Sequence, residues 1–213
     1  MLQHTALSAD DTRNSNGRYS PKEHGVLLLT GCKPGNTPPL AQALRMGGFA
    51  VMEIALSGTT WEDWLTAAKD GFMELSKRCA WVSVVGIHLG GCMALLLGEQ
   101  MHPSALIAIS VPTTSRRLQT MKDTPDFQPV NSHHCSHIIS MARRDLHAVT
   151  CPILVVQSRQ DKTFDTNSAE MILQGVSSRR KGVLWLKGES NDAFADLAFA
   201  SVAHLRRAEY ISE

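Results

Sequence analysis

The sequence predicts a single α/β domain in which helices cover both faces of a mostly parallel, six-stranded sheet. Its 213 residues suffice for one sizeable core, which would bury roughly 70% of the unfolded surface. From Gly25 onward, short apolar runs alternate with segments of helical periodicity, and this order of elements is typical of a parallel sheet. The runs are continuously apolar rather than alternating, as expected for strands buried on both faces.

The predicted elements follow one another in a regular order along the chain. Each apolar run is taken as a strand, and each periodic segment between two runs is taken as a helix. The predicted strands span residues 25–29, 50–54, 81–85, 105–110, 153–157 and 183–186. The predicted helices span residues 40–46, 61–75, 90–99, 168–174 and 192–209.

Two segments fall outside this order. Residues 1–22 are polar and rich in Ser, Asn and Asp, which predicts a loosely ordered arm before a domain of residues 23–213. Residues 112–148 are rich in Pro, Thr, Ser, Arg and His, and they are too many for a plain connection between neighbouring strands. Their number predicts a short cap inserted after the fourth strand.

Composition narrows the classes of partner and the cellular compartment. The 21 Lys and Arg nearly balance the 20 Asp and Glu, so no strong attraction to nucleic acid or to an anionic membrane is expected. The five cysteines are scattered without a CxxC pair, which predicts free thiols in a reducing cytoplasm. Neither a leader-like segment nor a run of about 18 apolar residues is found, so a cytoplasmic protein without a membrane span is expected. No cofactor is expected, and the oligomeric state is left open.

The most informative segment joins the third predicted strand to the helix that follows it. It reads Gly86-Ile87-His88-Leu89-Gly90-Gly91, which is the strand–turn–helix pattern G-x-S-x-G with histidine in place of serine. The glycines allow strand and helix to approach closely around a strained central residue. The segment therefore predicts a nucleophile elbow that has lost its oxygen nucleophile.

With this elbow, the chain resembles the α/β-hydrolase family over about residues 24–207, and within it small bacterial carboxylesterases and monoacylglycerol lipases with a short cap. Residues 25–32, GVLLLTGC, are similar to the family's first core strand and oxyanion loop, where Thr30 and Cys32 replace His and Phe. Residues 145–161 are similar to the strand that leads to the catalytic acid. Residues 184–191 are similar to the last strand and the loop that carries the catalytic histidine.

The resemblance implies positions for the three members of a catalytic triad. The acid position falls on Asp161 and matches the family. The nucleophile position falls on His88, and the base position falls on Asn191, or on Asp192 if the alignment shifts by one residue. Two of the three roles are therefore vacant. The oxyanion hole implied by the resemblance consists of the backbone N–H groups of Leu89 and Cys32, which do not depend on side chains.

His88 has three interpretations. It is a histidine tolerated in a redundant elbow and hydrogen-bonded to Asp161 or to a loop carbonyl, or it binds a ligand at the floor of a pocket. The third interpretation is direct catalysis, either as a nucleophile or as the base for Cys32. For Cys32, the alternative to a reactive thiol is a small buried residue that fills the place of the family's Phe.

The predicted cap contains a second group of titratable residues. His133, His134 and His137 lie with Cys135 within five residues and are weak candidates for a zinc or nickel site above His88. A solvated helix or loop of the cap is the alternative. Because so short a segment rarely supplies three ligands, no metal is predicted.

These observations lead to three hypotheses about function. The first is an esterase- or lipase-like protein with a degenerate triad that binds a small ester, acyl or carbonyl ligand without ordinary serine-esterase activity. The second is an active hydrolase that uses His88, with or without Cys32, in place of the serine triad. The third is a non-catalytic scaffold or regulatory protein. The sequence leaves open whether the protein is an enzyme, because a fold does not determine a function.

Overall fold

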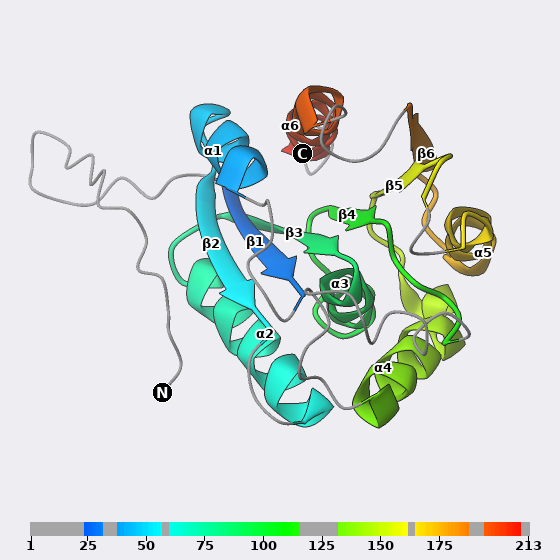
Figure 1. Ribbon diagram of the computed structural model, residues 1–213. Coiled ribbons are helices and arrows are strands. Elements are labelled where there is room, and N and C mark those ends of the chain that lie inside the picture. Colours follow the sequence, from blue (N-terminus) through cyan, green and yellow to red (C-terminus); the bar gives the residue numbers. More distant parts are fainter. Residues whose placement is uncertain are drawn as a thin grey trace, which may run out of the picture.

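The computed structural model describes residues 24–31, 38–56, 60–115, 132–161, 165–187 and 194–209. Within these ranges the chain forms three layers, with a sheet between two layers of helices (Figure 1). The predicted arm, residues 1–22, lies outside the described residues.

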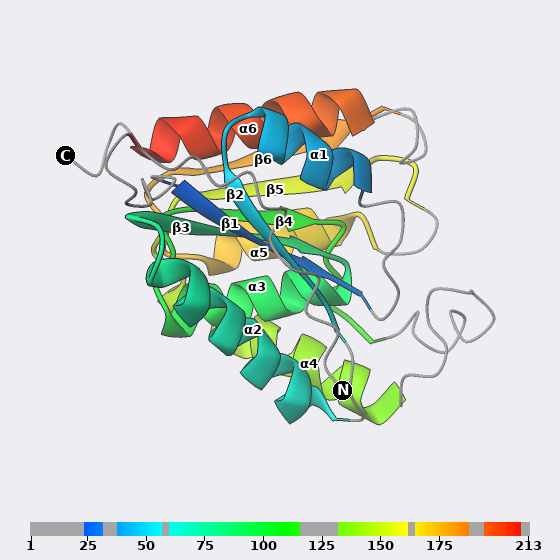
Figure 2. The ribbon, with the colours of Figure 1, turned by 90° about the vertical axis from the view of Figure 1, so that its left-hand side faces the viewer.

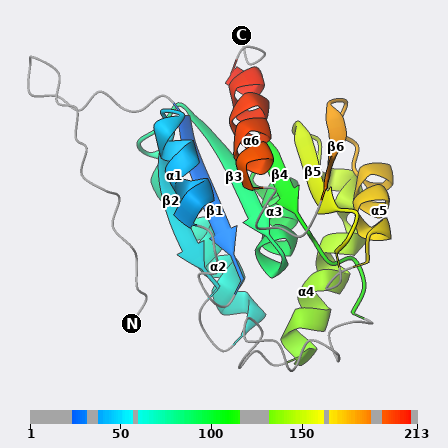
Figure 3. The ribbon, with the colours of Figure 1, turned by 45° about the horizontal axis from the view of Figure 1, so that its top comes forward.

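The sheet has six strands in the order β2-β1-β3-β4-β5-β6. All five pairings between neighbouring strands are parallel, which confirms the predicted parallel sheet. Figure 3 shows the strands side by side, with β2 at one edge and β6 at the other. The strands are β1 (His24–Thr30), β2 (Ala50–Ala55), β3 (Trp81–Ile87), β4 (Leu106–Ile109), β5 (Ile153–Ser158) and β6 (Lys181–Leu186).

Helices cover both faces of the sheet, as predicted. Helices α1 and α6 lie on one face, and α2, α3, α4 and α5 lie on the other (Figure 2). The helices are α1 (Pro38–Met46), α2 (Trp61–Ser76), α3 (Leu89–Gln100), α4 (Ser132–Arg144), α5 (Asn167–Gly175) and α6 (Phe194–Glu209), and a short 3-10 turn, η3 (Leu146–Ala148), follows α4. No helix in the described ranges is long and apolar enough to cross a membrane.

The two faces of each strand contribute to two separate cores. On β1, Leu27 and Leu29 belong to the core beneath α2–α5, whereas Val26 and Leu28 belong to the core beneath α1 and α6. Successive side chains of a strand point to opposite faces, so a strand covered on both sides must be apolar at every position. This requirement explains the continuous apolar runs of the sequence.

The segment expected to form a cap contains a helix that belongs to the core. In α4, Cys135, Ile138, Ile139 and Ala142 are all buried, at spacings of three and four residues that form one helical stripe. This stripe joins the core beneath α2–α5, so α4 packs within the helical layer beside α3 and is not a solvated helix or loop. Residues 116–131, the remaining middle part of the expected cap, lie outside the described residues.

Candidate functional site at the carboxyl edge of the sheet

The candidate site is built around the turn between β3 and α3. Strand β3 ends at Ile87 and helix α3 begins at Leu89, so His88 alone connects the two elements. Its φ of 55° and ψ of −118° lie in a region that residues with a side chain rarely adopt. The backbone at His88 is therefore strained, as expected for the central residue of a nucleophile elbow.

Three glycines make this strained turn possible. A Cβ atom on Gly86 would lie 2.4 Å from the carbonyl oxygen of Gly90, and one on Gly90 would lie 2.3 Å from the carbonyl oxygen of Leu29. A Cβ atom on Gly91 would lie 2.2 Å from a methyl carbon of Val111. The first two contacts are with backbone, which cannot move aside without displacing a strand or a helix. The glycines thus permit the close approach of α3 to the sheet.

Backbone hydrogen bonds fix His88 in place. Its N–H donates to the carbonyl of Ile109 on β4 at 3.0 Å, and its own carbonyl accepts from the N–H of Gly91 at 3.0 Å and of Cys92 at 3.4 Å. The first N–H groups of a helix have no acceptor within the helix, and they carry its positive partial charge. The N–H of Leu89 is one of these groups at α3. Leu89 is the first residue of α3, Cys32 lies outside the described residues, and the oxyanion hole stays a prediction.

Asp161 follows β5. Like His88, it lies at the carboxyl ends of the parallel strands, which we call the carboxyl edge of the sheet. Its Oδ2 atom accepts a hydrogen bond of 2.7 Å from the side-chain amide of Gln157, which is completely buried in β5. The Oε1 atom of the same amide is buried and has no hydrogen-bond partner. The carboxylate is half-buried and held by its own strand. Asn191, the predicted base position, lies outside the described residues, so the roles of the three triad positions stay predictions.

Two residues of this edge were not singled out in the sequence. Ser110 directly follows β4, is half-buried and has a positive φ of 46°. Gln157 is an amide in an otherwise apolar strand. The backbone angle of Ser110 depends on where β4 ends, and local sequence gives no signal for it. The polar residue within an apolar run was a signal for Gln157.

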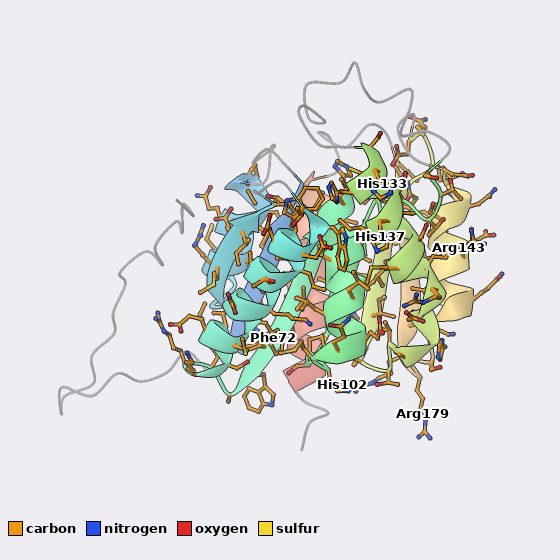
Figure 4. All side chains as sticks on the ribbon, turned by 90° about the horizontal axis from the view of Figure 1, so that it is seen from below. Phe72, His102, His133, His137, Arg143 and Arg179 are labelled. Carbon is orange, nitrogen blue, oxygen red and sulfur yellow. The ribbon has the colours of Figure 1, made fainter. Side chains whose placement is uncertain are left out.

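The histidines of α4 lie beside the start of α2. The rings of His137 and Trp61 are 4.8 Å apart between centroids, and the rings of His133 and His134 are 5.9 Å apart. Figure 4 shows His133 and His137 toward one end of the helical layer, with His102 and Arg179 toward the other. Within the described ranges, no group of three or more His, Cys, Asp or Glu residues is arranged to hold a metal ion.

The described cysteines are poorly suited to nucleophilic chemistry. Cys79, Cys92, Cys135 and Cys151 are all buried. Burial raises the pKa of the Cys151 thiol to about 12 and raises the pKa of Cys92 further, with a smaller contribution from the neighbouring Cys135. The Cys92 thiol also donates to the carbonyl of Pro112 at 3.5 Å. Because the reactive species is the thiolate, these four residues are structural.

In sequence and in fold, the chain is similar to lipolytic enzymes. No protein-family model matches the chain. A thermostable monoacylglycerol lipase from Bacillus sp. (strain H-257) is 25% identical in an alignment 211 positions long that covers 81% of this chain and 84% of the relative.

Solved structures show the same fold. A structure of the metagenome-derived lipolytic enzymes LipS and LipT matches with a TM-score of 0.76 at 21% identity, over 88% of this chain and 95% of that one. The monoacylglycerol lipase of Paleococcus ferrophilus matches with a TM-score of 0.72 at 14% identity, over 88% and 96% of the two chains. Est1E from Butyrivibrio proteoclasticus matches with a TM-score of 0.70 at 13% identity, over 89% and 90%.

The parallel sheet with helices on both faces, the strained turn at His88 and these similarities together define the α/β-hydrolase fold. The chain is similar to esterases and lipases that share this fold, and its curated relative is a monoacylglycerol lipase. The expected α/β-hydrolase architecture is confirmed.

Proposed function

We propose that the carboxyl edge of the sheet around His88 binds a small ester, acyl or carbonyl ligand, without the ordinary chemistry of a serine esterase. The observation that carries the proposal is the strained backbone of His88, with a φ of 55° between β3 and α3. Strain of this kind persists only where the surrounding structure enforces it, and it is concentrated at binding and catalytic sites. The site geometry is therefore retained although its nucleophile is replaced.

The backbone of the elbow supplies the attraction for a carbonyl or carboxylate oxygen. The N-terminus of α3, a helix of 12 residues, directs backbone N–H groups and a positive partial charge toward the carboxyl ends of the strands. Leu89 provides the first of these groups immediately after His88. The His88 imidazole adds a group that donates or accepts a proton near neutral pH. A ligand with an ester or acid group fits this set of donors.

The same residues argue against ordinary serine-esterase turnover. The triad reaction needs a hydroxyl at the elbow and a base that accepts its proton. His88 supplies no hydroxyl, and the carboxamide of Asn191 does not accept a proton at neutral pH. The curated relative acts, by its name, on monoacylglycerols, so monoacylglycerols and short-chain esters are the first ligands to test.

Thermal unfolding with and without ligand tests the proposal. Monobutyrin, monolaurin and butyrate are added to the wild-type protein and to His88→Ala, with glycerol as the control ligand. A ligand at 100 times its Kd stabilises the folded state by about 2.7 kcal/mol, which raises the Tm by a few degrees. We expect a shift with an ester or acid that is reduced in His88→Ala. A Tm that none of these ligands changes would contradict the proposal.

A further inference from the structure

Ser110 directly follows β4, the strand that pairs with the elbow strand β3. Of the described residues other than glycine, three have a positive φ: His88, His102 and Ser110. His102 lies in the turn after α3, at the amino ends of the strands. His88 and Ser110 both lie at the carboxyl edge, each at the first position after its strand. Two strained residues with polar side chains are therefore adjacent at the candidate site.

The strand register brings His88 and Ser110 to the same level. Ile87 of β3 pairs with Ile109 of β4, and the N–H of His88 donates to the carbonyl of Ile109 at 3.0 Å. The next residue on each strand is His88 on one and Ser110 on the other. Neighbouring strands lie about 4.8 Å apart, so the backbones of His88 and Ser110 are neighbours at this end of the sheet.

The chain beyond Ser110 continues along the first turn of α3. Val111 is the side chain that a Cβ atom on Gly91 would strike, and the carbonyl of Pro112 accepts the hydrogen bond of the Cys92 thiol. The N–H of Ser110 donates to the carbonyl of Val156 on β5 at 2.8 Å. These contacts fix Ser110 between the elbow and the strand that leads to Asp161.

His88 and Ser110 are accessible in part. Both are half-buried, as is Ile87 before His88, whereas Ile109, Val111 and Leu89 are buried. Asp161, held by Gln157, is also half-buried. The partly accessible groups at this edge thus include an imidazole, a hydroxyl and a carboxylate, which are the three groups of a hydrolytic triad.

We propose that Ser110 is the nucleophile of this site and that His88, at the position of the family's usual nucleophile, is its base. The proposal rests on the function proposed above and adds slow acyl transfer to ligand binding. The substrates are small carboxylic esters, whose carbonyl oxygen is bound by the N–H groups at the start of α3.

The reaction balances with water as the only co-reactant. As Oγ of Ser110 attacks the ester carbonyl carbon, its proton passes to the His88 imidazole. The bond to the alcohol oxygen then breaks, and the alcohol leaves with the proton from His88. Water attacks the acyl-serine and gives a proton to His88, which returns it to Ser110 as the carboxylic acid leaves. Each turnover consumes one ester and one water and releases one alcohol and one acid.

A fluorophosphonate probe followed by mass spectrometry tests the assignment. The probe forms a bond between phosphorus and a nucleophilic serine oxygen, with loss of fluoride. We expect one adduct on the wild-type protein, localised by peptide fragmentation to Ser110. Ser110→Gly should abolish it, and glycine adopts the positive φ of this position without strain, so the variant should fold. His88→Gln should slow the labelling roughly 100-fold because the base is lost.

Ser104→Ala is the matched control, since Ser104 precedes the same strand at the opposite edge of the sheet. This variant should be labelled like the wild type. No adduct, an adduct on another serine, or an adduct that persists in Ser110→Gly would overturn the proposal. The thermal shift with monobutyrin is measured on the same samples. A shift without an adduct refutes Ser110 as nucleophile and leaves ligand binding intact, whereas the absence of both refutes both proposals.

Discussion

Among the described residues, His24 and Ser83 form a hydrogen-bonded pair toward the amino ends of β1 and β3, and His88 and Ser110, which follow β3 and β4, are a second pair by strand register at the carboxyl ends. At the amino edge, Nε2 of His24 and Oγ of Ser83 are 2.8 Å apart, and the two residues are 3% and 0% exposed. At the carboxyl edge, His88 and Ser110 are both half-buried and both have a positive φ. The residue types are the same, but their surroundings differ.

The comparison shows how environment separates a structural pair from a chemical one. The ring of His24 also packs edge-on against Phe49, with centroids 5.0 Å apart, so the amino-edge pair is enclosed by the core. Such a pair stabilises the fold and is closed to a substrate. The carboxyl-edge pair is strained, partly accessible and next to the N-terminus of α3. Substitutions at the two pairs and in the structure around them should therefore differ in their effects on activity and stability.

The largest effect is expected from restoring the usual triad at the carboxyl edge. His88→Ser together with Asn191→His should raise hydrolysis of p-nitrophenyl butyrate above that of the wild type by roughly 100-fold or more, because a positioned base contributes roughly 10²–10⁴-fold. The single variant Asn191→His is the control and should show no comparable gain. If the double variant is no more active than this control, then the alignment of Asn191 with the family's histidine is wrong.

The glycines of the elbow should tolerate substitution far less than a glycine elsewhere in the sheet. In Gly90→Ala the added methyl group would meet the carbonyl oxygen of Leu29 at 2.3 Å, so we expect a loss of about 3 kcal/mol in the free energy of unfolding. Gly182→Ala on β6 has nothing within 4 Å of the added carbon and should be neutral or stabilising by about 0.5 kcal/mol. Urea denaturation of both variants measures the difference, and equal losses would argue against the tight elbow.

Removing the serine from each pair should have different effects on stability. Ser83→Ala leaves Nε2 of His24 buried without this hydrogen bond, which costs about 1–3 kcal/mol. In Ser110→Gly, glycine adopts the positive φ without strain, which stabilises the folded state. The greater freedom of glycine in the unfolded chain acts in the opposite direction, so the free energy of unfolding should change by less than about 1 kcal/mol. Chemical denaturation again provides the measurement. A loss in Ser110→Gly as large as that in Ser83→Ala would assign Ser110 a structural role.

The sequence predicted the fold and the elbow well because both depend on local pattern. Continuous apolar runs located all six strands, and the spacing of Gly86, Gly90 and Gly91 identified the turn at His88. Helix α4 was missed as a core element because its apolar stripe is interspersed with histidine, serine and arginine. The spacing of Cys135, Ile138 and Ile139 was a sufficient signal, but the polar composition of the segment obscured it.

The new part of the candidate site could not be predicted from local pattern. The fourth strand was expected to include Ser110, but β4 ends at Ile109 and Ser110 turns to a positive φ. Its proximity to His88 follows from the register of β3 with β4, which is a tertiary property. The hydrogen bond from the Gln157 amide to the Asp161 carboxylate likewise depends on the path of the chain after β5.

The smallest expected effect concerns His204, a half-buried histidine on α6. Its Nε2 atom is itself buried and has no hydrogen-bond partner among the described residues. Burial lowers the pKa of His204, and the nearby Arg180 and Arg207 lower it further, although backbone carbonyls act in the opposite direction. The folded protein thus keeps this ring neutral at a pH where the unfolded chain, with an ordinary histidine pKa of about 6.5, binds a proton. The free energy of unfolding should therefore fall as the pH decreases from about 6.5 toward the lowered pKa. Urea midpoints at pH 7.5 and 5.5 measure this fall, which should be smaller in His204→Gln. An unchanged pH dependence would mean that His204 is hydrated and not buried as described.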